Sequence, residues 1–407
     1  MNRVPAGRKA AGTAAVLLGG SAEILDFLVP LWAGSELGIG AEAIGILVAA
    51  ELLVSVAARP AAGWLADKRP RTVTAASGAA LYAVSCLGYA LAGSLSVAFG
   101  AAILGGVGGA LFWVSVRALA AEYLDRDSGS MAGLLSSEAF GSWFFWVPAM
   151  VLLPAVGFAG VLGALALACT AAAVVLLCAP RRRPTSPEDG SGPVRDSLHP
   201  PRSYRGDVVR MAPLLFVAGG TAVAEAGVGL LLLLHLQGAF GLEVYQIALV
   251  YLPGGIVLTM LPRMLHRFVQ RYGRRTGYVT ASIASALTAA GLAFSPAPLA
   301  IAALWVLTCV SWALLLPMYG EVAAELNPRL LGRAMSILGN AGLLGAAVGS
   351  LLAGFLYAGD SWQAACLVFA AILLAGSVLG PLALAKMGVR DRPGPDTANT
   401  PRELLPE

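Results

Sequence analysis

The sequence predicts an all-α membrane protein with twelve transmembrane helices arranged as two six-helix halves. Three observations lead to this prediction. The 407-residue chain has a mean hydropathy of +0.77 and 12% charged residues, whereas soluble domains carry about 25%. Its apolar residues form long segments. Its basic residues are confined to alternate loops.

Twelve apolar segments account for most of the chain, and most of them reach the ~20 residues with which a helix crosses ~30 Å of hydrocarbon. The segments are too long for membrane strands and show no alternation of polar and apolar residues. No cleavable signal peptide is evident, so we expect the first segment to span the membrane. The segments are residues 10–33, 42–64, 73–93, 96–120, 131–153, 157–179, 211–236, 243–262, 276–294, 297–318, 332–357 and 363–386.

The basic residues predict the orientation. The N-terminal tail and the loops after each even-numbered segment up to the tenth contain Arg or Lys, whereas the odd-numbered loops contain neither. The positive-inside rule therefore places both termini in the cytoplasm. The net charge of +4 reflects this bias, so we expect no nucleic-acid partner. Arginine outnumbers lysine, as in GC-rich bacterial coding, and we expect a bacterial cytoplasmic (inner) membrane.

The chain divides near its middle. Residues 180–207 are rich in Pro, Ser, Gly and Arg and have no apolar period, which predicts a flexible cytoplasmic linker. The linker separates an N-terminal six-helix half, residues 1–179, from a C-terminal half, residues 208–390. We expect residues 391–407 to form a disordered cytoplasmic tail.

The two halves repeat weakly at one constant offset in the sequence, which is the spacing from Gly38 to Gly241. Parallel halves related by an axis along the membrane normal are an expected architecture for carriers. The matching pairs are Gly38 with Gly241, Gly63 with His266, Arg71 with Arg274, Ala120–Glu122 with Ala323–Glu325, and Gly129 with Gly332.

The loop between the second and third segments is short and charged, and it must stay in water while its flanks lie in lipid. Its residues match a known signature loop, Gly-x-Leu-Ala-Asp-Arg-x-Gly-Arg-Arg, so the chain resembles the major facilitator superfamily. Pro70 and Thr72 depart from the signature. An ordinary cytoplasmic turn with solvated charges is the alternative. The matching residues are Gly63, Leu65, Ala66, Asp67, Lys68 and Arg71.

A degraded copy of this loop follows the eighth segment. Gly273 and Arg274 match it, but His266 replaces the glycine and Gln270 the aspartate. The second half therefore has no counterpart of Asp67 in its loop, and only the first half can form a salt bridge through this aspartate. The resemblance implies the major facilitator fold and a gating function for both loops. It assigns that function to Gly63, Asp67, Lys68, Arg71, Gly273 and Arg274.

Ionisable side chains inside the predicted helices are the candidate functional residues. Each costs ~2.5–3.5 kcal/mol or more at the bilayer centre, so each is a functional hypothesis. Glu23 and Asp26 are three residues apart and share one helical face. The resemblance implies that they surround a central cavity together with Glu225. The other candidates are Glu51, Glu138 and Arg117.

Five acids against one base indicate proton coupling or a cationic substrate, because two carboxylates in one dry cavity cannot both ionise cheaply. The alternative is that individual acids bond only Ser, Tyr or backbone groups in the bundle. Arg117 and Glu138 lie at similar heights on consecutive helices, which suggests a buried ion pair. Drug/proton antiporters of the superfamily carry an Arg in the fourth span, where this chain has Ala102.

Aromatic residues near the expected cavity could accept a cation, although lipid-facing or interfacial packing is the commoner explanation for any one of them. They are Trp113, Trp143, Phe144, Phe145, Trp146, Trp305 and Trp312. Glycines in the eleventh segment, Gly342, Gly345 and Gly349, permit close approach of helices.

These features favour a proton-coupled secondary transporter that exports small amphipathic or cationic molecules, such as drugs or natural products, by alternating access. A proton-coupled importer of a small metabolite and a lipid flippase are alternatives on the same fold. No nucleophile triad, phosphate loop or metal-ligand cluster occurs, so we expect neither an enzyme nor a cofactor. The expected partners are a small-molecule substrate, protons and the lipid bilayer, and a monomer is expected.

Overall fold

The structure is a computed structural model that describes residues 6–121, 130–179, 204–327, 331–359 and 361–392. This part of the chain is all-helical and contains no strand. Its helices are α1 (Ala6–Ser35), α2 (Ala41–Lys68), α3 (Arg71–Ala90), α4 (Leu95–Ala121), α5 (Ser130–Cys178), α6 (Tyr204–Gly238), α7 (Val244–Met260), α8 (Pro262–Tyr272), α9 (Arg274–Leu292), α10 (Pro298–Leu326), α11 (Leu331–Ala358) and α12 (Trp362–Lys386).

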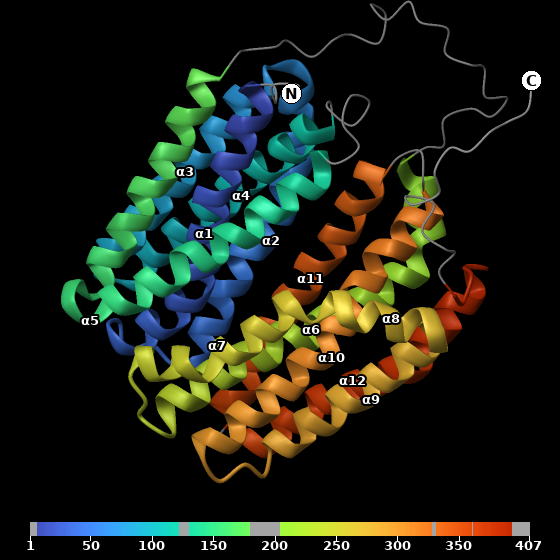
Figure 1. Ribbon diagram of the computed structural model, residues 1–407. Helices are drawn as coiled ribbons and strands as arrows, with labels where there is room; N and C mark the ends of the chain where they lie inside the picture. The colour runs from blue at the N-terminus through green and yellow to red at the C-terminus, as the bar shows by residue number, and fades with distance from the viewer. Residues whose placement is uncertain (1–5, 122–129, 180–203, 328–330, 360, 393–407) are drawn as a thin grey trace, which may run out of the picture.

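Nine of the described helices are long and apolar enough to cross a membrane, or ten if α7 and α8 form one bent span. The α5 helix holds the fifth and sixth predicted segments, which join at Gly157, where φ is 67°. Figure 1 shows the resulting hairpin. The α9 helix is less apolar than its neighbours α10 and α12, and it packs between them. The prediction of twelve membrane-spanning helices is therefore confirmed.

The eighth predicted span, 243–262, agrees with the structure to within two residues, but the loop expected after it is helical. Its helix, α7, ends at Met260, and α8 then continues at an angle of 57° to it. Apolar Phe268 and Val269 on α8 pack against the helical core, while Arg267 and Arg271 are exposed. A helix with one charged and one apolar face is stable at the boundary of a bundle, not across it.

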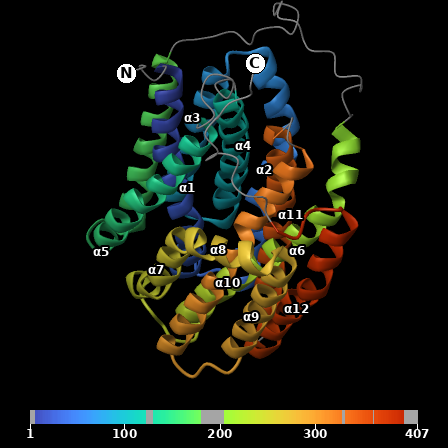
Figure 2. The same ribbon diagram turned by 45° about the vertical axis from the view of Figure 1, so that its right-hand side comes forward.

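The helices form two groups, with α1–α5 in one and α6–α12 in the other (Figure 1). We call the end of the bundle where α2 ends and α9 begins the basic end, and the opposite end the far end. The longest contact between the groups is that of α2 with α11, which lie side by side in Figure 2.

Two turns at the far end repeat the same hydrogen bonds at the offset that relates the two halves. The amide of Ile39 donates to the carbonyl of Ala33, and that of Leu242 donates to the carbonyl of Leu236. Each turn contains a glycine with φ of 60°, Gly38 or Gly241, a conformation that other residues rarely adopt.

Glycines also set the tightest helix crossings in each group. A Cβ on Gly141 of α5 would collide with the carbonyl of Val16 on α1. A Cβ on Gly345 of α11 would collide with the carbonyl of Gly219 on α6. Val16 and Gly219 are related by the same sequence offset as the two turns. Close backbone approach through small residues is how helices associate in a membrane, so the two groups share one packing scheme.

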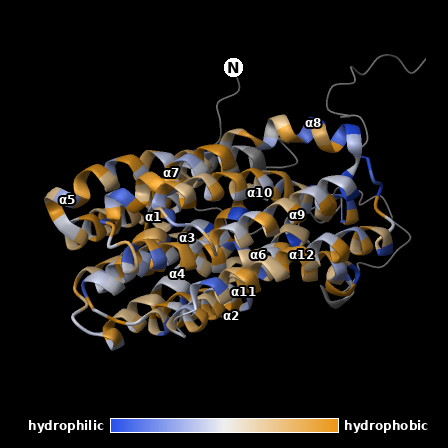
Figure 3. Ribbon diagram, turned by 90° about the horizontal axis from the view of Figure 1, so that it is seen from below, coloured by the Kyte–Doolittle hydropathy of each residue, from blue (hydrophilic) through white to orange (hydrophobic). Residues whose placement is uncertain are grey.

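Large apolar side chains cover much of the outer surface. Leu167, Phe216 and Leu287 expose 73%, 69% and 68% of their surface. Figure 3 shows hydrophobic residues along the length of the helices, while hydrophilic residues gather at the end of α8. An apolar exterior of this extent is the surface that a lipid bilayer covers.

The α6–α11 crossing gives a test of the packing scheme. Gly345→Ala should lower the melting temperature of the purified protein in detergent, because the added methyl group meets the backbone of α6; such overpacking costs about 1–3 kcal/mol. Gly342→Ala is the matched control on the same helix, because its Cβ would meet nothing within 4 Å. Equal melting temperatures for the two variants would contradict the packing scheme.

Candidate functional site

A cavity of about 570 Å³ lies between the two groups of helices. Its walls come from α1, α2 and α5 on one side and from α6, α7, α10 and α11 on the other. Its charged lining residues are all acids: Glu23, Asp26, Glu51 and Glu225. No lysine or arginine of the described chain lines it, so the cavity favours protons and cationic groups.

The α1 helix contributes two of the four carboxylates. Glu23 and Asp26 lie three residues apart on the helical face toward the cavity, and both side chains are exposed there. The intervening residues, Ile24 and Leu25, are buried, and of these two only Leu25 also borders the cavity. The alternation of core and cavity residues along α1 follows from the 3.6-residue helical period.

Glu51 reaches the cavity from α2 and is held by α3. The hydroxyl of Tyr89 donates a hydrogen bond of 3.3 Å to Glu51 Oε2. Gly105 on α4 makes room for this carboxylate, because a Cβ there would lie 2.8 Å from Glu51 Oε1. The tyrosine fixes the position of the carboxylate without neutralising it. Glu51 is thus a lining residue, although the resemblance alone did not place it around the cavity.

Aromatic side chains form the apolar part of the wall. The Phe27 ring lies 4.6 Å from Trp146 and 5.6 Å from Tyr251, and the rings of Tyr251 and Trp305 are 4.8 Å apart. The Tyr251 hydroxyl donates to the carbonyl of Gly229 at 2.6 Å. Together with Trp143 these rings give an apolar, cation-accepting surface beside the acids.

Other aromatic candidates from the sequence lie elsewhere. Trp312 is buried in the core, and Phe144 is 57% exposed on the surface of the bundle. Phe145 packs against Gly20 at the α1–α5 crossing. Trp113 lies half-buried beside Gly19 and is absent from the cavity wall.

Glu138 and Arg117 do not line the cavity. The Glu138 side chain lies against Gly19 of α1, and the Arg117 guanidinium lies 5.5 Å from the centre of the Trp113 ring. The ion pair expected between these two described residues is not formed. The described part of α4 contributes no lining residue to the cavity.

Contacts across the cavity differ between its two ends. Toward the far end, the backbones come close: a Cβ on Gly45 would lie 2.6 Å from the carbonyl of Ser350. A side-chain bridge also joins the groups there, from Gln237 Nε2 to the carbonyl of Leu31 at 2.8 Å. Toward the basic end, the contacts are made by side chains. The Trp143 indole donates to Thr259 Oγ1 at 3.1 Å. Separating the groups at the basic end therefore breaks side-chain contacts, whereas separating them at the far end also breaks a close backbone contact.

The first basic loop is compact. Asp67 is exposed and forms no ion pair with another residue in the described part of the chain. The Lys68 ammonium lies 4.2 Å from the centre of the Trp64 ring, and Arg71 donates to the carbonyl of Ala118 at 3.1 Å. A Cβ on Gly63 would meet nothing within 4 Å. Close packing therefore does not require a glycine at this position.

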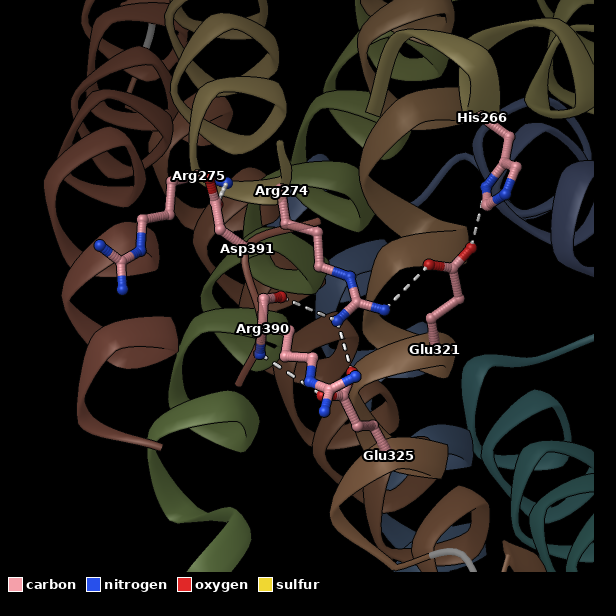
Figure 4. A network of polar contacts seen from close by, with 7 residues as sticks. All are labelled: His266, Arg274, Arg275, Glu321, Glu325, Arg390 and Asp391. Carbon is pink, nitrogen blue, oxygen red and sulfur yellow. Dashed lines mark hydrogen bonds and ion pairs between the residues drawn. The ribbon is translucent and has the colours of Figure 1, made fainter. Parts of the chain in front are cut away.

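The second basic loop, which the sequence suggests is degraded, carries a dense ion-pair network (Figure 4). Arg274 is buried, and its guanidinium contacts Glu325 at 2.5 Å and Glu321 at 3.4 Å, both on α10. His266 Nδ1 lies 3.2 Å from Glu321. The two α10 acids thus supply negative charge to this loop. The loop itself supplies none at the position of the signature aspartate, where it has Gln270.

The network also holds the start of the predicted tail. The carbonyl of Asp391 accepts a hydrogen bond from the Arg274 amide, and its carboxylate accepts one from the Arg275 amide. Asp391 thereby caps the positive N-terminal end of α9. Gly273, with φ of 90°, leaves room for this carboxylate. Residues 393–407 and the matching acid of the first half, Glu122, lie outside the described residues.

Arg59 lies within the second predicted segment, 42–64, but the sequence interpretation did not count it among the ionisable candidates. The structure places it inside α2, nine residues before the helix ends at Lys68, and half-buried. Arg117 is therefore not the sole basic residue within a span. Arg59 Nη1 donates a hydrogen bond of 2.5 Å to Oδ1 of Asn340, which lies 281 residues away in the sequence. No local sequence pattern could indicate a contact over this separation.

Comparisons with known proteins agree on the fold. The family model described as Major Facilitator Superfamily matches residues 11–269 and 264–406. No curated protein matches the chain by sequence. The structure of peptide transporter POT in complex with sulfate is similar with a TM-score of 0.75 and 13% identity, covering 95% of this chain and 96% of POT. Nucleoside transporter NupG gives a TM-score of 0.67 and 15% identity, covering 94% and 98%.

The Arg274 network gives a second test. Arg274→Gln should destabilise the protein by about 1.5–3 kcal/mol, because the two α10 carboxylates lose a charged hydrogen-bonding partner. Arg275→Gln removes the same charge one residue away, where the side chain is exposed, and should change stability little. Melting temperatures in detergent compare the two variants. Equal losses in the two variants would show that net charge, not the network, sets the stability.

Proposed function

Because the chain belongs to the major facilitator superfamily, we propose that it is a proton-coupled secondary transporter that exports small amphipathic or cationic molecules by alternating access. One observation carries this proposal: four carboxylates from α1, α2 and α6 line a single cavity between the two halves. We also propose that the basic end faces the cytoplasm of a bacterium, since the positive-inside rule favours that orientation.

Competition between protons and substrate supplies the coupling. Four carboxylates in one low-dielectric cavity repel one another, so neutralising them with protons or with a cationic group is favourable. A cationic substrate that enters from the cytoplasm displaces protons from Glu23, Asp26, Glu51 and Glu225. Protons that enter from the other side displace the substrate. Each ligand can then favour a different open state through its differential affinity.

The aromatic wall sets the class of substrate. Trp143, Trp146, Trp305, Phe27 and Tyr251 give the cavity apolar surface next to its acids. A molecule with an apolar ring system and an amine would bury its apolar part there while its charge faces the carboxylates. The volume of about 570 Å³ is within the usual range for small-molecule sites.

Alternating access needs a gate at each end, and the more easily opened gate is proposed to lie at the basic end. Opening there requires loss of the Trp143–Thr259 and Arg59–Asn340 hydrogen bonds, whereas opening at the far end requires separation of closely packed backbones. The basic loops with Asp67 and Arg274 would then stabilise the open and closed positions of their helices.

An importer of a small metabolite is the second candidate, because the same cavity and acids serve proton symport. The names of the similar structures, a peptide transporter and a nucleoside transporter, fit hydrophilic substrates of that kind. The sign of a flux driven by a pH gradient distinguishes the two candidates. A lipid flippase would instead move fluorescent lipid between leaflets without a pH gradient.

The proposal is tested with everted membrane vesicles that contain the overproduced protein and the cationic dye ethidium. Acidifying the vesicle interior should drive dye uptake by the native protein. Glu23→Gln/Asp26→Asn should reduce this uptake at least tenfold, because the cavity loses two proton-binding groups. Glu42→Gln is the matched control, since Glu42 is exposed in the first turn of α2 and does not line the cavity.

Two results would contradict the proposal. Uptake by the double variant that equals that of the native protein would exclude both residues from coupling. No ethidium uptake by the native protein, with proton-driven movement of metabolites in the opposite direction, would favour the importer.

A further inference from the structure

Two arginines from the N-terminal half converge on α11, between the cavity and the basic end. A Cβ on Gly339 would lie 3.5 Å from Arg59 Nη1 and 3.8 Å from Arg117 Nη1. Both guanidinium groups therefore approach the same point on the α11 backbone. One arginine comes from α2 and the other from α4, so the tertiary fold brings two positive charges together.

Neither guanidinium forms an ion pair with an acid in the described part of the chain. Arg59 donates to the neutral amide oxygen of Asn340, and its Nε is buried without any hydrogen-bond partner. The guanidinium of Arg117 lies over the Trp113 ring. Two like charges this close in a membrane-embedded region repel each other, and a bound anion would relieve that repulsion.

The arginines lie on the route between the basic end and the acidic cavity. Arg59 follows Glu51 by eight residues on α2, a distance of about 12 Å along the helix. Asn340 precedes the lining residue Ala346 by six residues on α11, or about 9 Å. An extended small molecule could therefore reach the arginines with one end while the other end lies among the carboxylates.

We propose that Arg59 and Arg117 form an anion-binding subsite that takes a carboxylate or phosphate group of the transported molecule. Guanidinium groups bind both anions through paired N–H donors, and the free Nε of Arg59 is such a donor. The inference rests on the proposed transport function and extends its substrate class to molecules that carry an anionic group in addition to a cationic one. A lipid phosphate has the same chemistry and is the competing source of the anion.

The test uses purified, full-length protein in detergent and inorganic phosphate as the probe. At constant ionic strength, phosphate should raise the melting temperature saturably, because a ligand that binds only the folded state stabilises it. Arg59→Gln and Arg117→Gln should each weaken phosphate binding at least tenfold. Arg267→Gln is the matched control, since Arg267 is exposed on α8, and its phosphate response should equal that of the native protein.

Two further measurements make each outcome decisive. Arg59→Lys keeps the charge but loses the paired donors, so it should bind phosphate more weakly than the native protein even if Arg59→Gln does not fold. Glu23→Gln/Asp26→Asn should retain the phosphate response, which separates failure of this subsite from failure of the proton-coupling proposal.

Lipid nanodiscs distinguish the source of the anion. With phosphatidylcholine alone, phosphate should stabilise the protein as it does in detergent, and adding phosphatidylglycerol should not remove that response. Loss of the phosphate response in phosphatidylglycerol would assign the subsite to lipid and overturn the substrate proposal. Unchanged phosphate binding in the Gln variants and in Arg59→Lys, or no phosphate binding by the native protein, would overturn the subsite itself.

Discussion

A carboxylate within a membrane is stable only when water, a proton or a cation reaches it. In this protein four carboxylates meet in one cavity between two groups of helices, and that arrangement constrains the surrounding structure. The acids need neighbours that leave room for a ligand. Aromatic rings and glycines are such neighbours. The Tyr89 hydroxyl holds Glu51 without supplying a positive charge. The charge of the site is therefore left for a ligand to neutralise.

The packing of each half provides the rigidity that such a site requires. Glycines at Gly141 and Gly345 bring helix backbones into contact at equivalent places in the two halves. Because these crossings leave no space for a side chain, each half resists internal change, and motion is easier between the halves than within them. The polar bridges toward the basic end, such as Trp143 to Thr259, are the contacts that a relative rotation can exchange.

Much of this architecture is predictable from local sequence pattern. Hydrophobic segment length predicts the helices, and the constant offset between the halves predicts the paired turns at Gly38 and Gly241. The position of Glu23 and Asp26 on one face of α1 follows from helical period alone. The position of Arg59 between the halves and the capping of α9 by Asp391 depend on partners far away in the sequence. The same holds for the lack of a direct ion pair between Arg117 and Glu138, because helix rotation is set by packing and not by height in the membrane.

The central claim is that protonation of the cavity acids changes which end of the bundle is open. Spin labels at Glu36 and Ala239 would report the far end, and labels at Lys68 and Met264 the basic end; all four positions are exposed. A Cys178→Ser background removes the one exposed cysteine. Pulsed electron paramagnetic resonance in nanodiscs between pH 5 and 9 should show the distance between the two far-end labels and the distance between the two basic-end labels changing in opposite directions. Both changes should vanish when all four cavity acids are replaced by amides. Distances that do not depend on pH, or an equal dependence without the acids, would contradict the claim.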